Sequence, residues 1–144
     1  MARRIRVLLV EDNPGDVDLI RDSLEEVTSN LEITVIGDGA EALDYLFQRT
    51  EPVGGNGRPL PDLVLLDLNL PKLSGHEVLS EARRAFDLRS LPIVVVTSSD
   101  AARDIVTSYE LGANSYVTKP GELVAFQRTV KALGNFWCNV ARLP

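Results

Sequence analysis

Carboxylates follow two apolar runs of the sequence. Glu11 and Asp12 come directly after residues 5–10, and Asp67 comes directly after residues 63–66, which read LVLL. Such runs are typical of strands that are buried on both faces of a parallel sheet. In an open parallel sheet the chemistry sits beyond the carboxyl ends of the strands, so these carboxylates are candidate working groups. Asp is also common in turns, and Asp67 taken alone could equally well end a strand without a further role.

Two more apolar runs end in a hydroxyl group and in an amine. Thr97 follows residues 93–96, which are rich in β-branched side chains, and Lys119 follows residues 115–118. Taken singly, Thr97 could be a helix-start hydroxyl and Lys119 an exposed lysine. The Glu11-Asp12 pair could likewise be a solvated turn. Their occurrence together at the ends of four expected strands is far more specific, and it indicates a chemical site.

The combination of groups suits phosphoryl transfer with a bound Mg²⁺ ion. Three carboxylates against one lysine leave a local negative charge, and like charges this close oppose one another's ionisation. Mg²⁺ would relieve that charge because it prefers a few oxygen ligands, whereas a zinc site would need a His or Cys cluster. Asp67 could then attack phosphorus and form an aspartyl phosphate. Lys119 would stabilise the charge of the phosphoryl group, and the Thr97 hydroxyl would donate to one of its oxygens.

Helical patterns separate the apolar runs. Asn13-Pro14 is a helix-start signal, and Ser74 with Glu77 forms a capping-box pattern. The expected strands cover residues 5–10, 33–36, 63–66, 93–96 and 115–118. The expected helices run from Pro14 through Val27, over residues 40–48, from Ser74 through Phe86, through Ile105, Val106 and Tyr109 to Gly112, and over residues 122–140. In the last helix one apolar stripe is expected to contain Leu123, Phe126, Val130, Leu133, Trp137 and Val140.

Five strands that alternate with five helices favour a parallel sheet with helices on both faces. We expect an α/β fold of the doubly wound, flavodoxin-like (βα)5 type, with a five-stranded parallel sheet in the order 2-1-3-4-5. This order brings the ends of the first, third, fourth and fifth strands to one edge of the sheet. Residues 49–61, with three glycines and three prolines, are predicted to be a long exposed loop, a tolerated insertion rather than a binding element.

Composition narrows the classes of function. A chain of 144 residues fits a single domain over residues 1–144. The net charge of -6 argues against a nucleic-acid surface. The apolar run near the N-terminus is too short for a signal peptide, and no stretch approaches the roughly 20 apolar residues of a membrane helix, so a cytoplasmic location without membrane contact is expected. Cys138 is interpreted as a small, half-buried apolar residue, and His76 as a surface residue.

Four segments of the chain resemble the receiver domains of two-component response regulators. They are VLLVEDN at residues 7–13, DLVLLDLNLPKLSG at residues 62–75, VVVTSS at residues 94–99 and GANSYVTKP at residues 112–120. The resemblance covers almost the whole chain. It departs from the family's common residues at Glu11, Leu70 and Ser98, where Asp, Met and Ala are frequent, and none of these departures removes a required group.

The resemblance implies roles for individual residues. Asp67 would accept a phosphoryl group from a histidine of a sensor histidine kinase. Mg²⁺ would be held by Asp12, by Asp67 and by the backbone carbonyl of Asn69, with Glu11 acting through water.

The resemblance also implies a conformational switch. Thr97 and Tyr116 correspond to the family's switch pair, in which the hydroxyl moves to the phosphoryl group and the aromatic ring turns inward. Lys119-Pro120 resembles the family's lysine that precedes a cis-proline. Charge at Asp67 would change the face formed by the fourth helix, the fifth strand and the fifth helix.

The C-terminal residues FWCNVARLP narrow the resemblance further. They look like the tail of small stand-alone regulators that are paired with phytochrome-type (bacteriophytochrome) sensor kinases, as does the long loop before the third strand. With no residues expected for a separate output domain, the output must be another, downstream protein. Phe136 and Trp137 predict a homodimer through the last helix, although they could instead cap the intramolecular core.

Two other classes of function compete with the phosphorylation switch. A phosphatase or phosphotransferase enzyme that forms an aspartyl phosphate usually carries a second Asp two residues after the nucleophile, and Asn69 cannot serve as that acid. A flavodoxin-like cofactor-binding module would need a phosphate-binding loop after the first strand, where Glu11 and Asp12 would repel the phosphate. We therefore expect a signalling protein rather than an enzyme.

Overall fold

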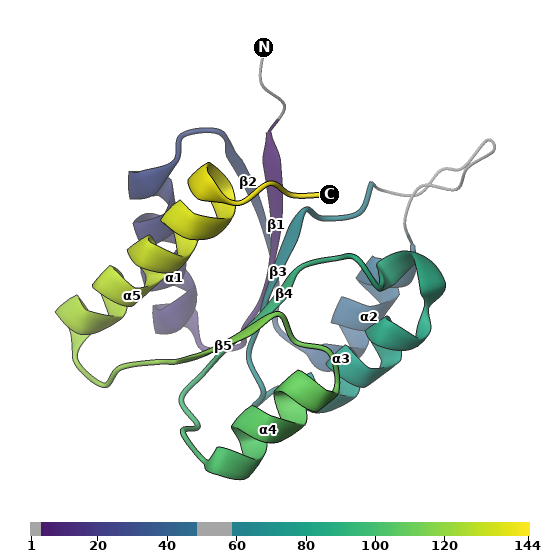
Figure 1. Ribbon diagram of the computed structural model, residues 1–144. Helices are drawn as coiled ribbons and strands as arrows, with labels where there is room; N and C mark the ends of the chain where they lie inside the picture. The colour runs from purple at the N-terminus through teal and green to yellow at the C-terminus, as the bar shows by residue number, and fades with distance from the viewer. Residues whose placement is uncertain (1–3, 49–58) are drawn as a thin grey trace.

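A parallel sheet with helices on both faces organises the chain (Figure 1). The computed structural model describes residues 4–48 and 59–144. Within these residues the strands are β1 (Ile5–Val10), β2 (Leu31–Ile36), β3 (Leu63–Leu66), β4 (Ile93–Thr97) and β5 (Ser115–Thr118). The helices are α1 (Pro14–Val27), α2 (Gly39–Phe47), α3 (Gly75–Arg84), α4 (Ala102–Glu110) and α5 (Leu123–Asn135), with a 3-10 helix (Phe86–Leu88) after α3 and a π-helical segment (Phe136–Val140) after α5.

The strand order is β2-β1-β3-β4-β5, and every neighbouring pair is parallel. The predicted fold class and strand order are therefore confirmed. In the register of the sheet, Val10 lies opposite Leu66, Leu66 opposite Val95, and Thr97 opposite Thr118. Since these residues end or nearly end their strands, the residues that follow β1, β3, β4 and β5 meet at one edge of the sheet.

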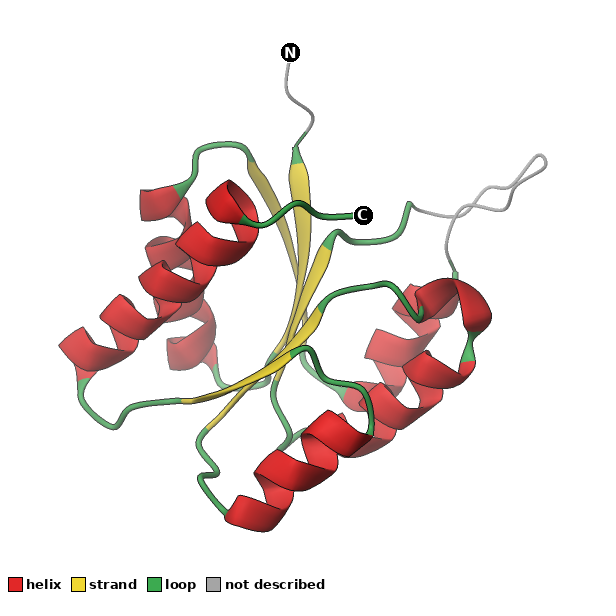
Figure 2. Cartoon of the chain, viewed as in Figure 1, coloured by secondary structure: helices red, strands yellow, loops and turns green. Residues whose placement is uncertain are grey.

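Side chains of alternating strand residues form two separate cores. Val7 and Leu9 of β1 pack toward α1 and α5, whereas Leu8 and Val10 pack toward α2 and α3. This alternation follows from the period of two residues in a strand. Figure 2 shows the resulting three layers, with α1 and α5 on one face of the sheet and the other three helices on the opposite face. Each fully buried leucine in these cores contributes roughly 1.5–3 kcal/mol.

Capping residues confirm the predicted starts of α1 and α3 and the predicted end of α4. The Asn13 side chain accepts a hydrogen bond from the Asp16 N–H at the start of α1. Ser74 and Glu77 form both halves of the capping box of α3. Gly112 has φ of 106°, a left-handed conformation that few other residues adopt, and it lies just after the end of α4. β2 begins two residues earlier than predicted, because Leu31 and Glu32 continue the pairing with β1.

The prediction that Phe86 belongs to α3 is wrong. α3 ends at Arg84, and Phe86 lies in the 3-10 helix with 82% of its surface exposed. Leu88, which is fully buried, takes the core position instead. The Arg83 guanidinium donates to the Leu88 carbonyl at 2.6 Å and so holds this short segment against the end of α3.

The predicted apolar stripe of the last helix is only partly correct. Phe126, Val130 and Leu133 are buried, and Trp137 packs against the same core, but Leu123 and Val140 are largely exposed. Leu123 is the first residue of α5. Val140 lies in the π-helical segment, where the Ala141 N–H donates to the Phe136 carbonyl at 2.7 Å and the wider turn shifts the residues out of the α-helical phase.

Other predictions concern the chain's loops and its single cysteine. Most of the predicted loop of residues 49–61 falls on residues 49–58, which lie outside the described residues; Pro59, Leu60 and Pro61 belong to no helix or strand. Cys138 is half-buried, and burial raises the pKa of its thiol. No helix in the described ranges has both the length and the apolar character to cross a membrane.

Candidate functional site

The predicted functional groups meet at the carboxyl edge of the sheet. The Thr97 hydroxyl donates to Asp67 Oδ1 at 2.8 Å. The Lys119 ammonium donates to Asp67 Oδ2 at 3.0 Å and to Glu11 Oε1 at 2.5 Å. Residues up to 108 positions apart in the sequence are thus in direct contact. Asp67, Glu11 and Thr97 are buried, whereas Asp12 is exposed at the mouth of the site.

Backbone contacts fix the position of Asp67 between β3 and α3. The Asp67 N–H donates to the Val10 carbonyl at 3.0 Å, which continues the pairing of β3 with β1. The Asn69 N–H donates to Asp67 Oδ1 at 3.1 Å. Gly75, the first residue of α3, lies so close that a Cβ atom there would be 2.3 Å from the Asp67 carbonyl oxygen. Glycine therefore allows α3 to begin directly against the backbone of Asp67.

Three carboxylates form a cluster that fits a divalent cation. One oxygen from each of Glu11, Asp12 and Asp67 lies within 4.8 Å of the others. All the donors are oxygen atoms, and the exposed Asp12 leaves room for water molecules in the coordination sphere. This donor set is the kind that Mg²⁺, Mn²⁺ or Ca²⁺ prefers over softer metals. The residues present thus fit the metal that the sequence predicted.

The pKa values of Glu11 and Asp67 shift in opposite directions. Burial, with the nearby charge of Asp67, raises the pKa of Glu11 to about 7, although hydrogen bonds from Lys119 and from the Asn13 N–H act against that rise. Burial would also raise the pKa of Asp67, but hydrogen bonds from Lys119, the Asn69 N–H and Thr97 outweigh it and hold that pKa below its usual value. Asp67 is therefore ionised at neutral pH, as a nucleophile must be.

Asp16, a fourth carboxylate of the site that was not predicted from the sequence, also contacts Lys119. The Lys119 ammonium donates to Asp16 Oδ2 at 2.8 Å. Burial would lower the pKa of Lys119, but the hydrogen bonds to Asp16, Glu11 and Asp67 raise it above its usual value. Asp16 lies in the first turn of α1, where an acidic residue is ordinarily explained by the helix dipole. The expected start of a helix at Pro14, two residues after Asp12, could have indicated that Asp16 lies near the site, because it places the first helical turn beside Asp12.

Tyr116 connects the site to α4. Its hydroxyl donates to the Ser99 carbonyl at 2.8 Å, two residues beyond Thr97, and its backbone N–H donates to the Tyr109 hydroxyl at 3.1 Å. The Ser99 hydroxyl in turn donates to Asp104 Oδ2 at 2.6 Å. Burial raises the pKa of Tyr116. The two residues predicted as a switch pair thus lie at the end of β4 and against Ser99, in the segment that links β4 to α4.

The structure answers one open question about neighbouring residues and corrects one expectation. The isomer of the Lys119-Pro120 peptide bond, which the sequence leaves open, is trans, as are the other peptide bonds of the described residues. His76 is not simply a surface residue, because it is half-buried with its Nε2 atom 2.9 Å from the Ser108 Oγ atom. The Ser108 hydroxyl donates to the Asp104 carbonyl at 2.7 Å, so His76 is the donor in this pair and links α3 to α4.

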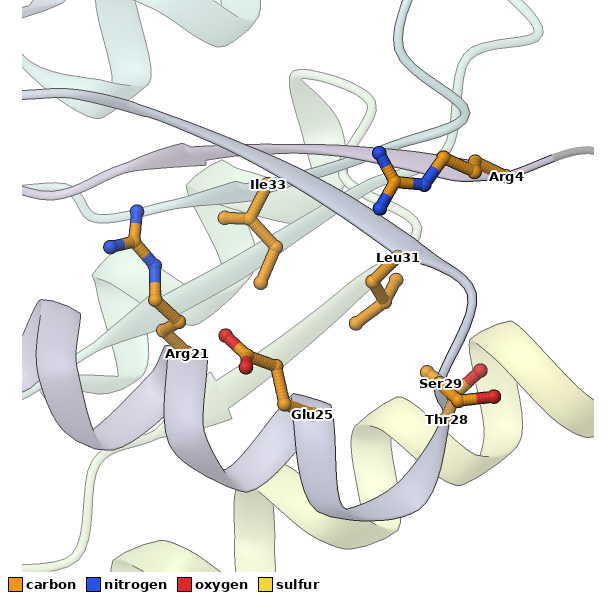
Figure 3. A pocket seen from close by; sticks show the side chains of 7 residues that line it. All are labelled: Arg4, Arg21, Glu25, Thr28, Ser29, Leu31 and Ile33. Carbon is orange, nitrogen blue, oxygen red and sulfur yellow. The ribbon is translucent and has the colours of Figure 1, made fainter.

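A hollow of about 420 Å³ lies away from this site (Figure 3). It lies beside the beginnings of β1 and β2 and the second half of α1. Its lining comprises Arg4, Arg21, Glu25, Thr28, Ser29, Leu31 and Ile33. Because the strands are parallel, their beginnings are at the end of the sheet opposite the carboxylate cluster, and the hollow is separate from the candidate site.

Comparison with known proteins identifies relatives along nearly the whole chain. The profile of the response regulator receiver domain matches residues 7–131. Response regulator Rcp1 of Synechocystis sp. is 39% identical over 138 residues, which is 96% of this chain and 92% of the relative. A crystal structure of the phosphorylated cyanobacterial phytochrome response regulator RcpA has a TM-score of 0.87 and 41% identity, covering 98% of this chain and 99% of that chain. A crystal structure of the Mn²⁺-bound form of response regulator Rcp1 has a TM-score of 0.88 and 38% identity, with 97% and 99% covered.

Proposed function

The chain belongs to the family of response regulator receiver domains, and from this premise we propose that Asp67 is its phosphoryl acceptor in two-component signalling. One observation carries the assignment. Asp67 is a buried carboxylate that is held between the Thr97 hydroxyl at 2.8 Å and the Lys119 ammonium at 3.0 Å. The phosphoryl donor is a sensor histidine kinase.

Asp67, Lys119 and Thr97 have different roles in phosphoryl transfer. An oxygen of the Asp67 carboxylate supplies the electron pair for a new bond to phosphorus, while the bond from phosphorus to the histidine nitrogen of the kinase breaks and that nitrogen keeps its electron pair. Lys119 donates to one phosphoryl oxygen. The Thr97 hydroxyl leaves Asp67 Oδ1 and donates to another phosphoryl oxygen, which stabilises the charge of the group.

Mg²⁺ is the metal that we propose for the site. Its protein ligands would be Asp12, Asp67 and the backbone carbonyl of Asn69, with Glu11 holding a bound water. When bound, Mg²⁺ supplies positive charge that offsets the carboxylates and the transferring phosphoryl group. The oxygen-only donor set and the exposed position of Asp12 support this choice.

Intact mass measurement tests the assignment of Asp67. The protein is incubated with acetyl phosphate and Mg²⁺, and the wild type is expected to gain the mass of one phosphoryl group. The Asp67→Asn variant should gain none, whereas Asp22→Asn, an exposed aspartate of α1, should behave as the wild type does. A gain of mass that persists in Asp67→Asn, or its absence from the wild type, would show that the assignment is wrong.

We further propose that the output is the binding of another protein at the face formed by α4, β5 and α5. Movement of Thr97 and Tyr116 would change this face when Asp67 is phosphorylated. Exposed apolar side chains are available there for a partner, namely Val106, Tyr109, Leu123 and Val124. The net charge of -6 favours a protein partner over nucleic acid.

A homodimer through the end of the last helix remains part of the proposal. Phe136 is 50% exposed, and its ring meets the Trp137 ring edge to face at 5.3 Å. Trp137 packs inward on the core, so Phe136 and Val140 provide the apolar surface for a second copy.

Sedimentation with and without a phosphate mimic should detect a dimer that Phe136→Ser weakens. Phe86→Ser, at an exposed phenylalanine elsewhere, is the matched control, and a monomer in both states contradicts the proposal.

The identity of the kinase is also part of the proposal. Because RcpA is a phytochrome response regulator and resembles this chain over nearly its full length, we propose a bacteriophytochrome-type kinase as the donor. The protein would act in the cytoplasm, where ATP supplies phosphoryl groups, as a stand-alone single-domain regulator and not as an enzyme. Phosphotransfer from such a kinase should be faster than transfer from an unrelated histidine kinase. Equal rates from both kinases would contradict this pairing.

A further inference from the structure

The Lys119 ammonium has no free hydrogen-bond donor. A lysine ammonium carries three N–H groups, and three carboxylates accept from Lys119, at 2.5 Å for Glu11, 2.8 Å for Asp16 and 3.0 Å for Asp67. The Lys119 side chain is only 9% exposed. Its position is therefore determined by three ionic hydrogen bonds rather than by solvent.

Asp16 differs from the other two acceptors in where it comes from. Glu11 and Asp67 follow strands of the sheet, whereas Asp16 belongs to the first turn of α1 and its side chain is 29% exposed. The Asp16 N–H donates to the Asn13 side chain at 3.0 Å, and the Asn13 N–H donates to Glu11 Oε2 at 3.1 Å. The backbone of Asp16 is thus linked through Asn13 to the Glu11 side chain, and the carboxylates of Asp16 and Glu11 both accept from Lys119.

We propose that Asp16 is a positioning residue for phosphoryl transfer. It holds the Lys119 ammonium in place, so that the N–H that donates to Asp67 Oδ2 can donate to a phosphoryl oxygen after transfer. The proposal rests on the proposed function of Asp67. Asp67 Oδ1 already accepts from Thr97 and from the Asn69 N–H, whereas Oδ2 accepts only from Lys119 among the hydrogen bonds of the described residues. Oδ2 is therefore the oxygen that is more available to attack.

The transfer step shows what Asp16 contributes. As the bond from Asp67 Oδ2 to phosphorus forms, the bond from phosphorus to the donor's leaving group breaks, and the leaving group keeps its electron pair. The N–H of Lys119 that pointed at Oδ2 then needs to turn only as far as the adjoining phosphoryl oxygen. Glu11 and Asp16 retain the other two N–H groups throughout. Without Asp16 the ammonium is held by one fixed carboxylate and loses this orientation.

Two simpler roles of Asp16 make different predictions. A carboxylate in the first turn of a helix can stabilise the helix dipole, which would affect stability but not the rate of phosphorylation. A carboxylate near the metal cluster can also strengthen Mg²⁺ binding, and that effect disappears once the metal is saturating. A role through Lys119 persists at saturating Mg²⁺ and requires the lysine.

A double-mutant cycle with Lys119 tests the positioning role. The initial rate of Asp67 phosphorylation by acetyl phosphate is measured by intact mass at saturating Mg²⁺. We expect Asp16→Ala to lower this rate about tenfold, which corresponds to the loss of one charge-assisted hydrogen bond. In the Lys119→Ala background, the same substitution should change the rate less than about twofold, because coupled residues are not additive. Asp22→Ala, at an exposed carboxylate of the same helix, should leave the rate unchanged in both backgrounds.

A second variant keeps the test decisive if Lys119→Ala is too slow to measure. Asp16→Asn retains an acceptor oxygen but loses the charge, so its rate should lie between those of the wild type and Asp16→Ala. Wild-type rates in Asp16→Ala, together with normal phosphorylation of Asp67, would overturn the role of Asp16 and leave the proposed function intact. An equal slowing by Asp16→Ala with and without Lys119 would overturn it as well. A wild type that gains no phosphoryl group on Asp67 would overturn the proposed function and this inference with it.

Discussion

Glu11 and Asp67 are buried carboxylates that accept hydrogen bonds from the same ammonium group, yet their pKa values shift in opposite directions. The difference lies in the other partners. Burial acts to raise the pKa of both groups, but Asp67 also accepts from the Thr97 hydroxyl and the Asn69 N–H. Glu11 accepts one further hydrogen bond, from the Asn13 N–H, and lies beside the charge of Asp67. Asp67 thus keeps the charge of a nucleophile. A nearby divalent cation would stabilise the ionised form of Glu11.

Mg²⁺ should stabilise the protein through the exposed carboxylate of the cluster. In thermal unfolding, we expect the wild type to gain about 1.4 kcal/mol at a free Mg²⁺ concentration ten times the dissociation constant, and to lose this gain when EDTA removes the metal. Asp12→Asn should abolish most of the gain because it removes a ligand. Asp22→Asn on the exposed side of α1 should retain it. Equal gains in the two variants would exclude Asp12 as a ligand.

The half-buried Cys138 thiol gives a pH-dependent prediction. Burial raises its pKa in the folded state above the ordinary value. The folded chain therefore holds the thiol proton at a pH where the unfolded chain loses it. The stability that this thiol contributes is present below the unfolded pKa and is lost as the pH rises through the folded pKa. Alkylation by iodoacetamide at about pH 9 should be slow in the native protein and fast in urea. Equal rates in both states would contradict the effect of burial.

The residues of the site were predicted from the sequence where each one ends a strand. Asp67, Thr97 and Lys119 could be found because a parallel sheet brings strand ends together whatever their separation in the sequence. Asp16 could not be found in this way, because its contact with Lys119 depends on the distance and direction of α1 from the edge of the sheet. The spacing of apolar residues predicts a helix but not its direction relative to the sheet. The half-buried contact of His76 with Ser108 escaped prediction for the same reason, since it depends on the packing of α3 against α4.

At the level of secondary structure, the short connection from β3 to α3 determines where Asp67 lies. Gly75 should not tolerate a side chain, because a Cβ atom would lie 2.3 Å from the Asp67 carbonyl oxygen and 2.7 Å from the Leu68 Cα atom. We expect Gly75→Ala to destabilise the protein by about 2–4 kcal/mol, comparable to a severe steric defect in a core. Chemical denaturation measures the change.

Gly121→Ala is the matched control, because nothing lies within 4 Å of a Cβ atom at that position. It should leave the free energy of unfolding within about 1 kcal/mol of the wild type. If Gly75→Ala is as stable as Gly121→Ala, the close approach of α3 to the Asp67 backbone is not a constraint on the fold.

Arg83 joins α3 to the segments around it. Its guanidinium donates to the Leu88 carbonyl, to the Gly112 carbonyl at 3.0 Å and to the Asn114 side chain at 3.0 Å. Arg83→Ala removes three hydrogen bonds, although the Leu88 carbonyl still accepts from the Leu91 N–H and Asn114 Oδ1 from the Ile93 N–H. We therefore expect a loss of about 2–3 kcal/mol in urea unfolding. Arg84→Ala, which removes an exposed residue with one ion pair to Glu81, should cost less than about 0.5 kcal/mol. Comparable losses in the two variants would mean that the hydrogen bonds of Arg83 contribute little to stability.

The boundaries of the elements were less predictable than their order. The sequence around Phe86 continues the helical spacing of Val78, Leu79 and Ala82, and nothing local marks the helix end at Arg84. What ends the helix is tertiary, because the Arg83 guanidinium and the buried Leu88 stabilise a different path. The π-helical segment after α5 likewise follows no distinct pattern in the sequence.

At the level of the whole molecule, α4 buries fewer residues than any of the other four helices and is therefore less firmly attached. α1 and α5 share a core with Val7, Leu9 and other buried strand residues, whereas Ser108 is the one fully buried residue that α4 contributes within the described chain. The fold class and strand order followed from five strand patterns that alternate with five helical patterns, and from the apolar runs of the central strands β3 and β4, which had to be buried on both faces. The weak attachment of α4 did not follow, since Val106 and Tyr109 continue an apolar pattern but remain exposed.

Because α4 is weakly attached, we expect phosphorylation to change backbone hydrogen exchange in and around α4. Tyr116 bonds the Ser99 carbonyl, and Ser99 bonds Asp104 of α4, so withdrawal of Thr97 toward a phosphoryl group would act on this chain of contacts. Elements with few buried side chains open at low free energy. With beryllium fluoride as a phosphate mimic, hydrogen exchange should therefore change across residues 98–118 and stay constant across β2 and α2. Tyr116→Phe loses the hydrogen bond to Ser99 and should reduce the change. A uniform change across the whole sheet, or the same response in Tyr116→Phe, would mean that the signal does not travel through this hydroxyl.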